Sequence, residues 1–220
     1  MSLSLVENNE SDSQNEAGVK KYQINEIFYS LQGEGVRAGT PNIFIRFSGC
    51  NLQCSVETHG FDCDTEFISG VKYTQEQILE QVSSFGGCEW IIFTGGEPLL
   101  QLDKDLCEFF KSQGYKLAIE TNGTVDPGEA VIDMLDWITC SPKIAEHAVR
   151  LPVCNELKYV RDYGQGIPKP KLKNVEHQLI SPAFSGNFLN PKTLDWCIKL
   201  VKENPSWKLS VQQHKFWNIR

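Results

Sequence analysis

Three cysteines stand close together in the first third of the chain, in the order Cys50, Cys54 and Cys63. A structural zinc site normally has four protein ligands, and a cubane cluster that serves only electron transfer also takes four thiolates. A [4Fe-4S] cluster held by three thiolates instead keeps one iron open. A Thr-Gly-Gly-Glu-Pro segment follows at residues 94–98. Together these residues predict an iron–sulfur enzyme whose open iron binds a small molecule.

A zinc site is the alternative interpretation of the same cysteines. His59 lies between Cys54 and Cys63 and would complete a Cys3His site, which would make the chain a non-catalytic zinc-binding interaction module. That interpretation leaves the glycine-rich segment unexplained, and the cysteines lack a second close pair. The remaining cysteines are scattered singly among apolar neighbours, a pattern typical of buried thiols. They are Cys88, Cys107, Cys140, Cys154 and Cys197.

Length and charge limit the class of protein. A chain of 220 residues fits one α/β domain. The net charge of -7 argues against a nucleic-acid-binding surface. The longest apolar runs, such as residues 90–93, are far too short to span a membrane. The first residues are polar, without the apolar stretch of a secretory signal, so we expect a cytoplasmic protein. We expect residues 1–20 to be a disordered tail and residues 21–220 to form one domain.

Strand-like runs alternate with helical patterns along this domain. Strands are predicted at 24–29, 42–47, 90–94, 116–120, 137–139, 156–160, 178–180 and 208–212. Helices are predicted at 75–85, 104–113, 129–135 and 191–203, the first with Thr74 as N-cap and Gln77 in capping-box position. This alternation predicts an α/β fold with mostly parallel strands. The sheet would be a curved open sheet or a partial, modified TIM-like (βα) barrel.

The chemically distinctive residues follow the ends of these strands. Cys50 follows the second strand, Gly95 and Gly96 the third, residues 121–123 the fourth and residues 141–143 the fifth. Ligands of such folds gather at the carboxyl ends of the strands. We therefore expect the four loops to meet at one mouth.

Several motifs give the chain a family resemblance. They are Tyr-Ser-Leu-Gln-Gly-Glu-Gly at 29–35, Arg-Phe-Ser-Gly-Cys-Asn-Leu at 46–52, Cys-Asp-Thr at 63–65, Thr-Gly-Gly-Glu-Pro at 94–98, Glu-Thr-Asn-Gly at 120–123, Ser-Pro-Lys at 141–143 and Gln-His-Lys at 213–215. The chain resembles radical S-adenosylmethionine (SAM) enzymes and, within them, the 7-carboxy-7-deazaguanine synthase family. The resemblance runs from about residue 22 to 220, and Leu-Gln-Gly-Glu-Gly is its most specific part.

One feature departs from the superfamily pattern. The gap between Cys54 and Cys63 holds eight residues, 55–62, and Asp62 rather than an aromatic residue precedes Cys63. A longer loop adds little closure entropy, so three thiolates can still reach one cluster. The synthase family varies this gap, so the departure leaves the family resemblance intact.

The resemblance implies a reaction and its cofactors. They are a [4Fe-4S] cluster, SAM and Mg2+, and the enzyme would be a carbon–nitrogen lyase. It would convert 6-carboxy-5,6,7,8-tetrahydropterin to 7-carboxy-7-deazaguanine by a radical-mediated ring contraction with loss of ammonia, in queuosine and 7-deazapurine biosynthesis. The implied partners are this pterin, a reductant protein such as a flavodoxin or ferredoxin, and a second copy in a homodimer. No nucleic acid or membrane is expected.

The resemblance also implies a set of site residues. The expected cluster ligands are Cys50, Cys54 and Cys63, and Thr65 is the expected Mg2+ ligand. The expected SAM contacts are Gly96, Ser141, Pro142, Lys143, Ser181, Pro182, Ala183 and Phe184. The expected substrate contacts are Leu31, Gln32, Gly33, Arg46, Thr94 and Arg220, with the Arg46 guanidinium suited to a carboxylate. His214 and Lys215 are either site residues or polar residues at the end of a strand, and we favour the second interpretation.

A glycyl-radical activating enzyme is the rival within the superfamily. It shares the small core and a Thr-Gly-Gly-Glu-Pro segment but acts on the backbone of another protein. Such an enzyme would not need Gln32 and Arg46 arranged for a small anionic heterocycle. Ring-contraction activity on the pterin would separate the two enzymes.

Overall fold

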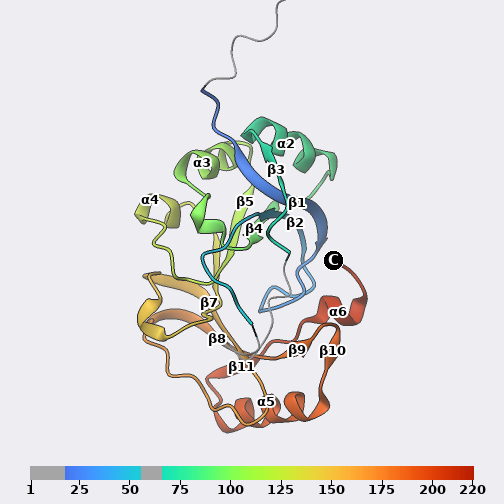
Figure 1. Ribbon diagram of the computed structural model, residues 1–220, viewed down its shortest axis with the longest axis vertical. Helices are drawn as coiled ribbons and strands as arrows, with labels where there is room; N and C mark the ends of the chain where they lie inside the picture. Colours follow the sequence, from blue (N-terminus) through green and yellow to red (C-terminus); the bar gives the residue numbers. More distant parts are fainter. Residues whose placement is uncertain (1–17, 56–65) are drawn as a thin grey trace, which may run out of the picture.

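The computed structural model describes residues 18–55 and 66–220 of the chain. Most of the tail predicted over residues 1–20 therefore lies outside the described residues, as do Cys63 and Thr65. The described part folds around a nine-stranded sheet in the order β11-β8-β7-β6-β5-β4-β2-β1-β3 (Figure 1). The strands are β1 (Tyr22–Leu31), β2 (Pro41–Phe47), β3 (Val71–Tyr73), β4 (Trp90–Gly95), β5 (Lys116–Thr121), β6 (Trp137–Cys140), β7 (Val153–Arg161), β8 (Asn174–Pro182) and β11 (Trp207–Leu209).

All neighbours from β2 to β11 run parallel, whereas β1 pairs antiparallel with both β2 and β3. In the described part of the chain the sheet keeps two separate edges, β11 and β3, so it does not close. The predicted α/β fold, with a partial barrel of mostly parallel strands, is confirmed.

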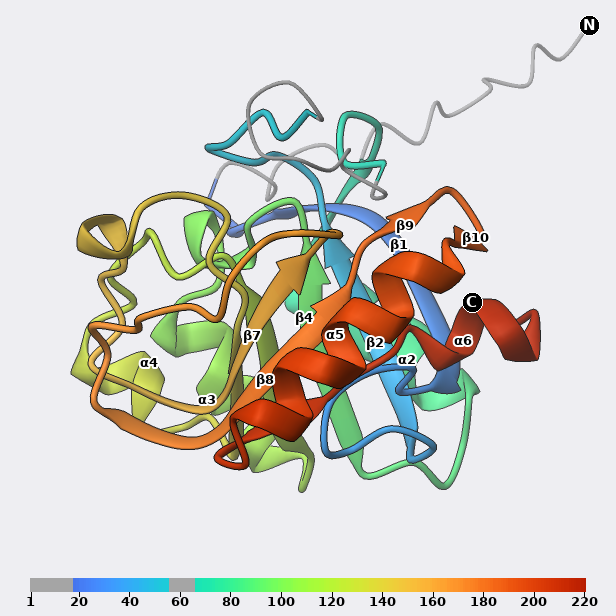
Figure 2. The same cartoon turned by 90° about the horizontal axis from the view of Figure 1, so that it is seen from below.

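Helices cover the outer face of the curved sheet (Figures 1 and 2). They are α2 (Gln75–Ser84), α3 (Lys104–Ser112), α4 (Glu129–Ile132) and α5 (Pro191–Glu203), with a short α6 (Gln213–Trp217) beyond β11. The predicted capping box of α2 is present, because Thr74 accepts from the Gln77 backbone and Gln77 from the Thr74 backbone. Among the described residues, no helix has the length and apolar character needed to cross a bilayer.

The pleat of the parallel strands separates two kinds of side chain. Alternate residues such as Phe47, Phe93 and Ile119 point to the helical layer and join one large buried core. The residues between them face the inside of the curve, where Phe28, Phe44, Ile92 and Ala118 form a second, small cluster. Polar side chains take over this inner face toward the carboxyl ends of the strands. The inner face is therefore where a polar site can form.

The carboxy-terminal third differs most from the sequence-based prediction. The last strand ends at Leu209 rather than 212, and residues 213–217 form α6. The interpretation of His214 and Lys215 as end-of-strand polar residues is therefore wrong, because both lie on this helix. The prediction also lacked a hairpin of β9 (Phe184–Ser185) and β10 (Phe188–Leu189). Earlier in the chain, it lacked the short strand β3. Strands of two or three residues are too short to carry a periodic signal.

Candidate active site

A cavity of about 910 Å³ opens on the inner side of the sheet, at the carboxyl ends of the strands. Its walls come from residues 31–34, from the ends of β2, β4, β5, β6, β7 and β8, from the β9–β10 hairpin and from residues 212–220. The four predicted loops all contribute to it, through Cys50, Gly96, Asn122 and Ser141 among others. The four loops therefore meet at one cavity, as the positions of the strand ends predicted.

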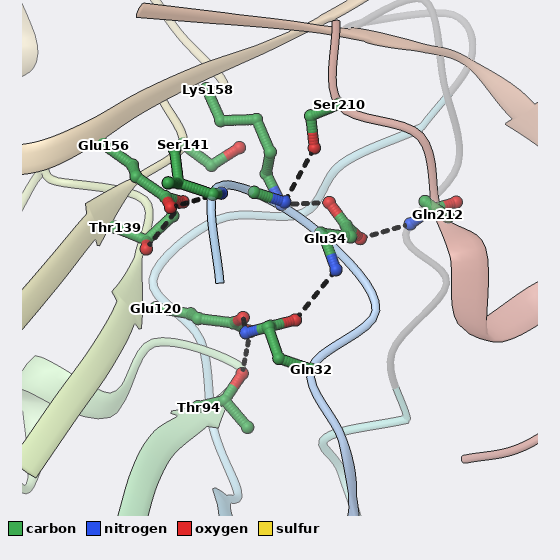
Figure 3. Close-up of polar contacts among 12 residues, drawn as sticks. Gln32, Glu34, Thr94, Glu120, Thr139, Ser141, Glu156, Lys158, Ser210 and Gln212 are labelled. Carbon is green, nitrogen blue, oxygen red and sulfur yellow. Dashed lines mark hydrogen bonds and ion pairs between the residues drawn. The ribbon is translucent and has the colours of Figure 1, made fainter. Parts of the chain in front are cut away.

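Gln32, Glu120 and Thr94 form a hydrogen-bonded wall of this cavity (Figure 3). Glu120 accepts a bond from the Gln32 side-chain amide at 2.8 Å through Oε1 and one from the Thr94 hydroxyl at 3.0 Å through Oε2. The side-chain oxygen Oε1 of Gln32 in turn accepts from the Glu34 backbone N–H at 3.0 Å. These bonds fix the orientation of the Gln32 amide, so its remaining hydrogen-bonding groups face the cavity in a defined arrangement.

Strand register explains how this polar row arises. Arg46 on β2 pairs with Thr94 on β4, Glu120 on β5 with Thr139 on β6, and Thr139 with Glu156 on β7. The sequence analysis assigned no role to Glu120 or Glu156. The sequence feature that could have identified them is a carboxylate within a largely apolar strand, at a position that alternates with the core residues. Lys-Leu-Ala-Ile-Glu-Thr at 116–121 is an example.

A buried ion pair joins Glu34 to Lys158 beside this wall. The Glu34 and Lys158 side chains are 14% and 11% exposed. Glu34 also accepts a bond from the Gln212 amide at 2.8 Å (Figure 3). Burial alone would raise the pKa of Glu34, but the Lys158 ammonium and the two hydrogen bonds outweigh it and lower the pKa to about 2. Burial lowers the pKa of Lys158, yet the Glu34 charge raises it above its usual value. Both groups are therefore charged at neutral pH.

Two arginines meet at another corner of the cavity. The Arg46 Nε lies 2.9 Å from one carboxylate oxygen of Glu26, and the Arg220 guanidinium lies 3.2 Å from the other. Both guanidinium carbons lie 5.7 Å from the centre of the Phe28 ring, which stacks on Phe44 at 4.9 Å. Glu26 thus holds two cations side by side above an aromatic floor, a suitable place for an anionic planar molecule.

The glycine-rich segment packs directly on the cysteine loop. A Cβ on Gly96 would lie 2.0 Å from the Gly49 carbonyl oxygen, and one on Gly95 would lie 2.2 Å from the Phe47 carbonyl oxygen. The Glu97 N–H also donates to the Gly49 carbonyl at 2.9 Å. Only glycine allows this approach, and Gly95 further has a φ of 126°. The two glycines therefore set the position of Cys50 relative to β4.

Glu97 ties this segment to the end of β5. Its buried carboxylate accepts bonds from the Thr121 hydroxyl at 2.6 Å and from the backbone N–H groups of Asn122 at 2.8 Å and Leu99 at 3.1 Å. Asn122 then donates to the Asn51 side chain at 3.1 Å, which returns the network to the cysteine loop. Burial raises the pKa of Glu97, while these three donors oppose the rise. Residues 49–51, at the start of the cysteine loop, are thus fixed to two strand ends.

Most of the residues predicted for SAM line the same cavity. Ser141 and Lys143 lie at the end of β6, with the Lys143 ammonium 3.0 Å from the Ser141 hydroxyl, and residues 181–184 lie at the end of β8. Pro142 differs, since it is buried and does not line the cavity. Of the predicted substrate contacts, all six line the cavity.

Comparisons with known proteins agree with this site. A 4Fe-4S single cluster domain model matches residues 31–125. The 7-carboxy-7-deazaguanine synthase of Bacteroides thetaiotaomicron is 42% identical over 200 residues, covering 90% of this chain and 98% of the relative. That of Burkholderia multivorans is 37% identical over 219 residues, covering 90% and 99%. The chain belongs to the 7-carboxy-7-deazaguanine synthase family. The crystal structure of QueE from Escherichia coli has the same fold, with a TM-score of 0.65 at 23% identity over 88% of this chain and 95% of that one.

Membership of the 7-carboxy-7-deazaguanine synthase family implies a [4Fe-4S] cluster and SAM, and the described residues fit both. Cys50 and Cys54 line the cavity mouth, and the Leu52 N–H points to the Cys50 sulfur at 3.4 Å, as N–H groups do around cluster thiolates. Among residues 18–55 and 66–220, no three His, Cys, Asp or Glu side chains are grouped as a metal site. The third predicted cluster ligand, Cys63, lies outside those residues, as does Thr65.

His214 and Lys215 line the cavity, in line with the interpretation that the sequence analysis did not favour. A Cβ on Gly33 would lie 2.0 Å from His214 Nδ1, so the imidazole packs flat against the glycine. The Lys215 ammonium donates to the Gly186 carbonyl at 2.9 Å and lies 4.6 Å from the Phe184 ring centre. Helix α6 thus contacts both Gly33 and the β9–β10 hairpin, which line the same cavity.

Proposed function

We propose that this chain is a 7-carboxy-7-deazaguanine synthase, a lyase that contracts 6-carboxy-5,6,7,8-tetrahydropterin to 7-carboxy-7-deazaguanine with loss of ammonia. One observation carries the proposal beyond family membership. A single cavity holds the cysteine loop at its mouth, a fixed amide and carboxylate wall, and a pair of arginines. A pterin carboxylate has the matching amide-like edge, planar ring and negative charge.

Each described group has a role in holding this substrate. Gln32 and Glu120 offer a donor, an acceptor and a negative charge to the pterin edge, and the Thr94 hydroxyl orients Glu120. Arg46 and Arg220 bind the carboxylate over the Phe28 ring. When bound, the reduced cluster and SAM supply the radical that removes one substrate hydrogen. The protein holds that hydrogen in one position relative to the radical.

The resemblance supports three further parts of the proposal. Gly96, Ser141, Pro142, Lys143 and residues 181–184 bind SAM, with Pro142 acting by shaping the backbone between two cavity residues. Thr65 supplies an oxygen ligand to a Mg2+ ion, in line with the preference of magnesium for few protein oxygens. A flavodoxin or ferredoxin supplies the electron, and the active form is a cytoplasmic homodimer.

The glycyl-radical activating enzyme has less support from the site. A peptide backbone substrate has neither a carboxylate for Arg46 and Arg220 nor an amide ring edge for Gln32. The cavity also has a carboxylate, Glu120, in its wall, which a neutral backbone glycine does not require.

One incubation tests the function. The anaerobically reconstituted chain is mixed with reductant, SAM and 6-carboxytetrahydropterin, and the products are separated and identified by mass. We expect the deazapurine carboxylate and one ammonia for each substrate consumed. Brown protein that cleaves SAM and leaves the pterin unchanged would refute the proposed substrate. A protein that binds zinc and no cluster would refute the whole reaction class.

A further inference from the structure

The carboxy-terminal segment, residues 210–220, makes repeated contacts with residues 30–35, which lie near the other end of the described sequence. The Gln213 N–H donates to the Gly33 carbonyl at 2.8 Å, and the Gly35 N–H donates to the Ser210 hydroxyl at 2.8 Å. The Ser30 hydroxyl donates to the Arg220 carbonyl at 2.6 Å. Both segments line the same cavity, so these contacts join two of its walls.

Glu34 stands at the centre of this junction. Its Oε2 pairs with Lys158 on β7, and its Oε1 accepts the Gln212 amide at 2.8 Å. Glu34 and its two partners come from three distant parts of the chain, since Lys158 is 124 and Gln212 is 178 residues from Glu34. The pair is nearly enclosed, with side chains 14% and 11% exposed.

We infer that the Glu34–Lys158 pair is a positioning device that uses Gln212 to hold the carboxy-terminal segment, and with it His214 and Arg220, against the substrate pocket. The inference rests on the proposed function, because it assigns these residues to the affinity for the carboxylated substrate. In this assignment the device acts through the carboxy-terminal segment and takes no part in the chemical step.

A purely stabilising role would not call for this chemistry. Two charges taken out of water lose hydration that their attraction repays only with good geometry, and an apolar pair of similar volume is often as stable. The Glu34 carboxylate, held in place by Lys158, accepts a directional hydrogen bond and so fixes where the Gln212 amide must lie. The direction of this hydrogen bond helps to place α6. A helix of this length is only marginally stable by itself, and α6 has no buried residue of its own.

Gln212 is the residue to change, because its loss leaves Glu34 still paired with Lys158. Gln212→Ala removes the amide, and Gln212→Glu places a second carboxylate beside Glu34. Gln113→Ala is the matched control, since Gln113 is exposed at the end of α3 and bonds only to Ser112 among the described contacts of its side chain. All three are made in the full chain with its cluster reconstituted.

The first readout is hydrogen exchange of the peptide that covers residues 211–220. We expect the Gln213 and Ile219 amides to exchange about tenfold faster in Gln212→Ala, and faster still in Gln212→Glu, because a hydrogen bond to a charged group is lost. Peptides of β4 and β5 should keep the parent rate in every variant. This readout requires no turnover and reports the segment directly.

The second readout is steady-state kinetics with the carboxylated pterin. We expect the KM to rise about tenfold in Gln212→Ala with kcat within about twofold of the parent, and Gln113→Ala to match the parent. Unchanged exchange and unchanged KM in Gln212→Ala would overturn the inference. A fall in kcat at parent KM would also overturn it, because Gln212 would then act in the chemistry. If the parent makes no deazapurine, the proposed function fails, while the exchange result still decides whether the device holds the segment.

Discussion

At the scale of single residues, the cavity is organised by carboxylates that fix their neighbours. Glu26 holds Arg46 and Arg220, Glu34 holds Lys158 and Gln212, and Glu120 holds Gln32. Each carboxylate thereby restricts one or two flexible side chains that line the cavity. The arrangement reduces the conformational entropy that substrate binding would otherwise cost.

Arg46 provides the first prediction at this scale. Arg46→Ala should assemble the cluster and bind SAM like the parent but lose at least about 30-fold in kcat/KM for the carboxylated pterin, which corresponds to about 2 kcal/mol or more. The reason is the loss of a charge-assisted contact to the carboxylate. Iron content, SAM binding by equilibrium dialysis and steady-state rates measure the three properties.

Arg150→Ala is the control for that change, because the Arg150 side chain is exposed and does not line the cavity. Turnover of Arg46→Ala at the parent rate would contradict the assignment of this corner to the carboxylate.

The Glu34–Lys158 pair provides a prediction on stability. Lys158→Met should lower the free energy of unfolding by about 3–5 kcal/mol, because it leaves the Glu34 charge buried without its cation. The double variant Glu34→Gln with Lys158→Met should lose much less, since no unpaired charge remains. Urea denaturation followed by circular dichroism at pH 7 compares the three proteins, and an equal loss in single and double variants would show that packing, not charge, is responsible.

The pH dependence of the same pair follows from the two pKa directions. The lowered pKa of Glu34, about 2, means that its contribution is present above the unfolded value of roughly 4.3 and is lost as pH falls toward 2. The raised pKa of Lys158 means that its contribution is present below roughly 10.4 and is lost only as pH rises through the higher folded value. The stability of the parent relative to the double variant should therefore be constant from about pH 5 to 10 and shrink in acid. If the stability difference between the parent and the double variant grew as the pH fell, the lowered pKa of Glu34 would be contradicted.

At the scale of elements, the strand ends were predictable and the contacts among them were not. Cysteines, glycines and a Ser-Pro-Lys segment each follow an apolar run, so their common edge could be read from the parallel alternation. The interaction of Glu34 with Lys158 has no local pattern, because the partners lie 124 residues apart. Helix α6 was missed because five residues after a short strand carry too little periodicity to be distinguished from its continuation.

The contact between the glycine turn and the cysteine loop gives a prediction at this scale. Gly96→Ala should reduce the iron and sulfide bound after reconstitution by more than half, because its Cβ would lie 2.0 Å from the Gly49 carbonyl and must push Cys50 away from β4. Gly166→Ala is the control, since a Cβ there meets nothing within 4 Å and its φ is not positive. Full cluster content in Gly96→Ala would show that the loop can shift without losing its ligands.

At the scale of the whole molecule, the thiols of the described residues differ in their environment. Cys50 and Cys54 line the cavity mouth, whereas Cys107, Cys140, Cys154 and Cys197 are buried in the layer between sheet and helices, as the sequence pattern predicted. Cys88 is only partly buried. Burial raises the pKa of Cys107 and Cys154 to about 12 and that of Cys197 to about 11. Buried neutral thiols react slowly, because the thiolate is the nucleophile.

This division predicts the order of alkylation. In cluster-free protein at pH 8, iodoacetamide should modify Cys50 and Cys54 within minutes and leave Cys107, Cys140, Cys154 and Cys197 unmodified until urea unfolds the chain. Mass spectrometry of tryptic peptides over time measures each site. Early modification of Cys107 or Cys154 would show that the core opens far more readily than its packing implies.

The pocket joins residues 30–34 to residues 212–220, and this has a consequence for the order in which the living cell can build the protein. The cysteine loop leaves the ribosome long before the residues that complete the pocket have been translated. A nascent chain can therefore present thiols to the iron-delivery machinery while it still lacks any means of holding a pterin. If these residues act as proposed, cluster insertion and the acquisition of substrate affinity would be separate steps in the synthesis of the protein.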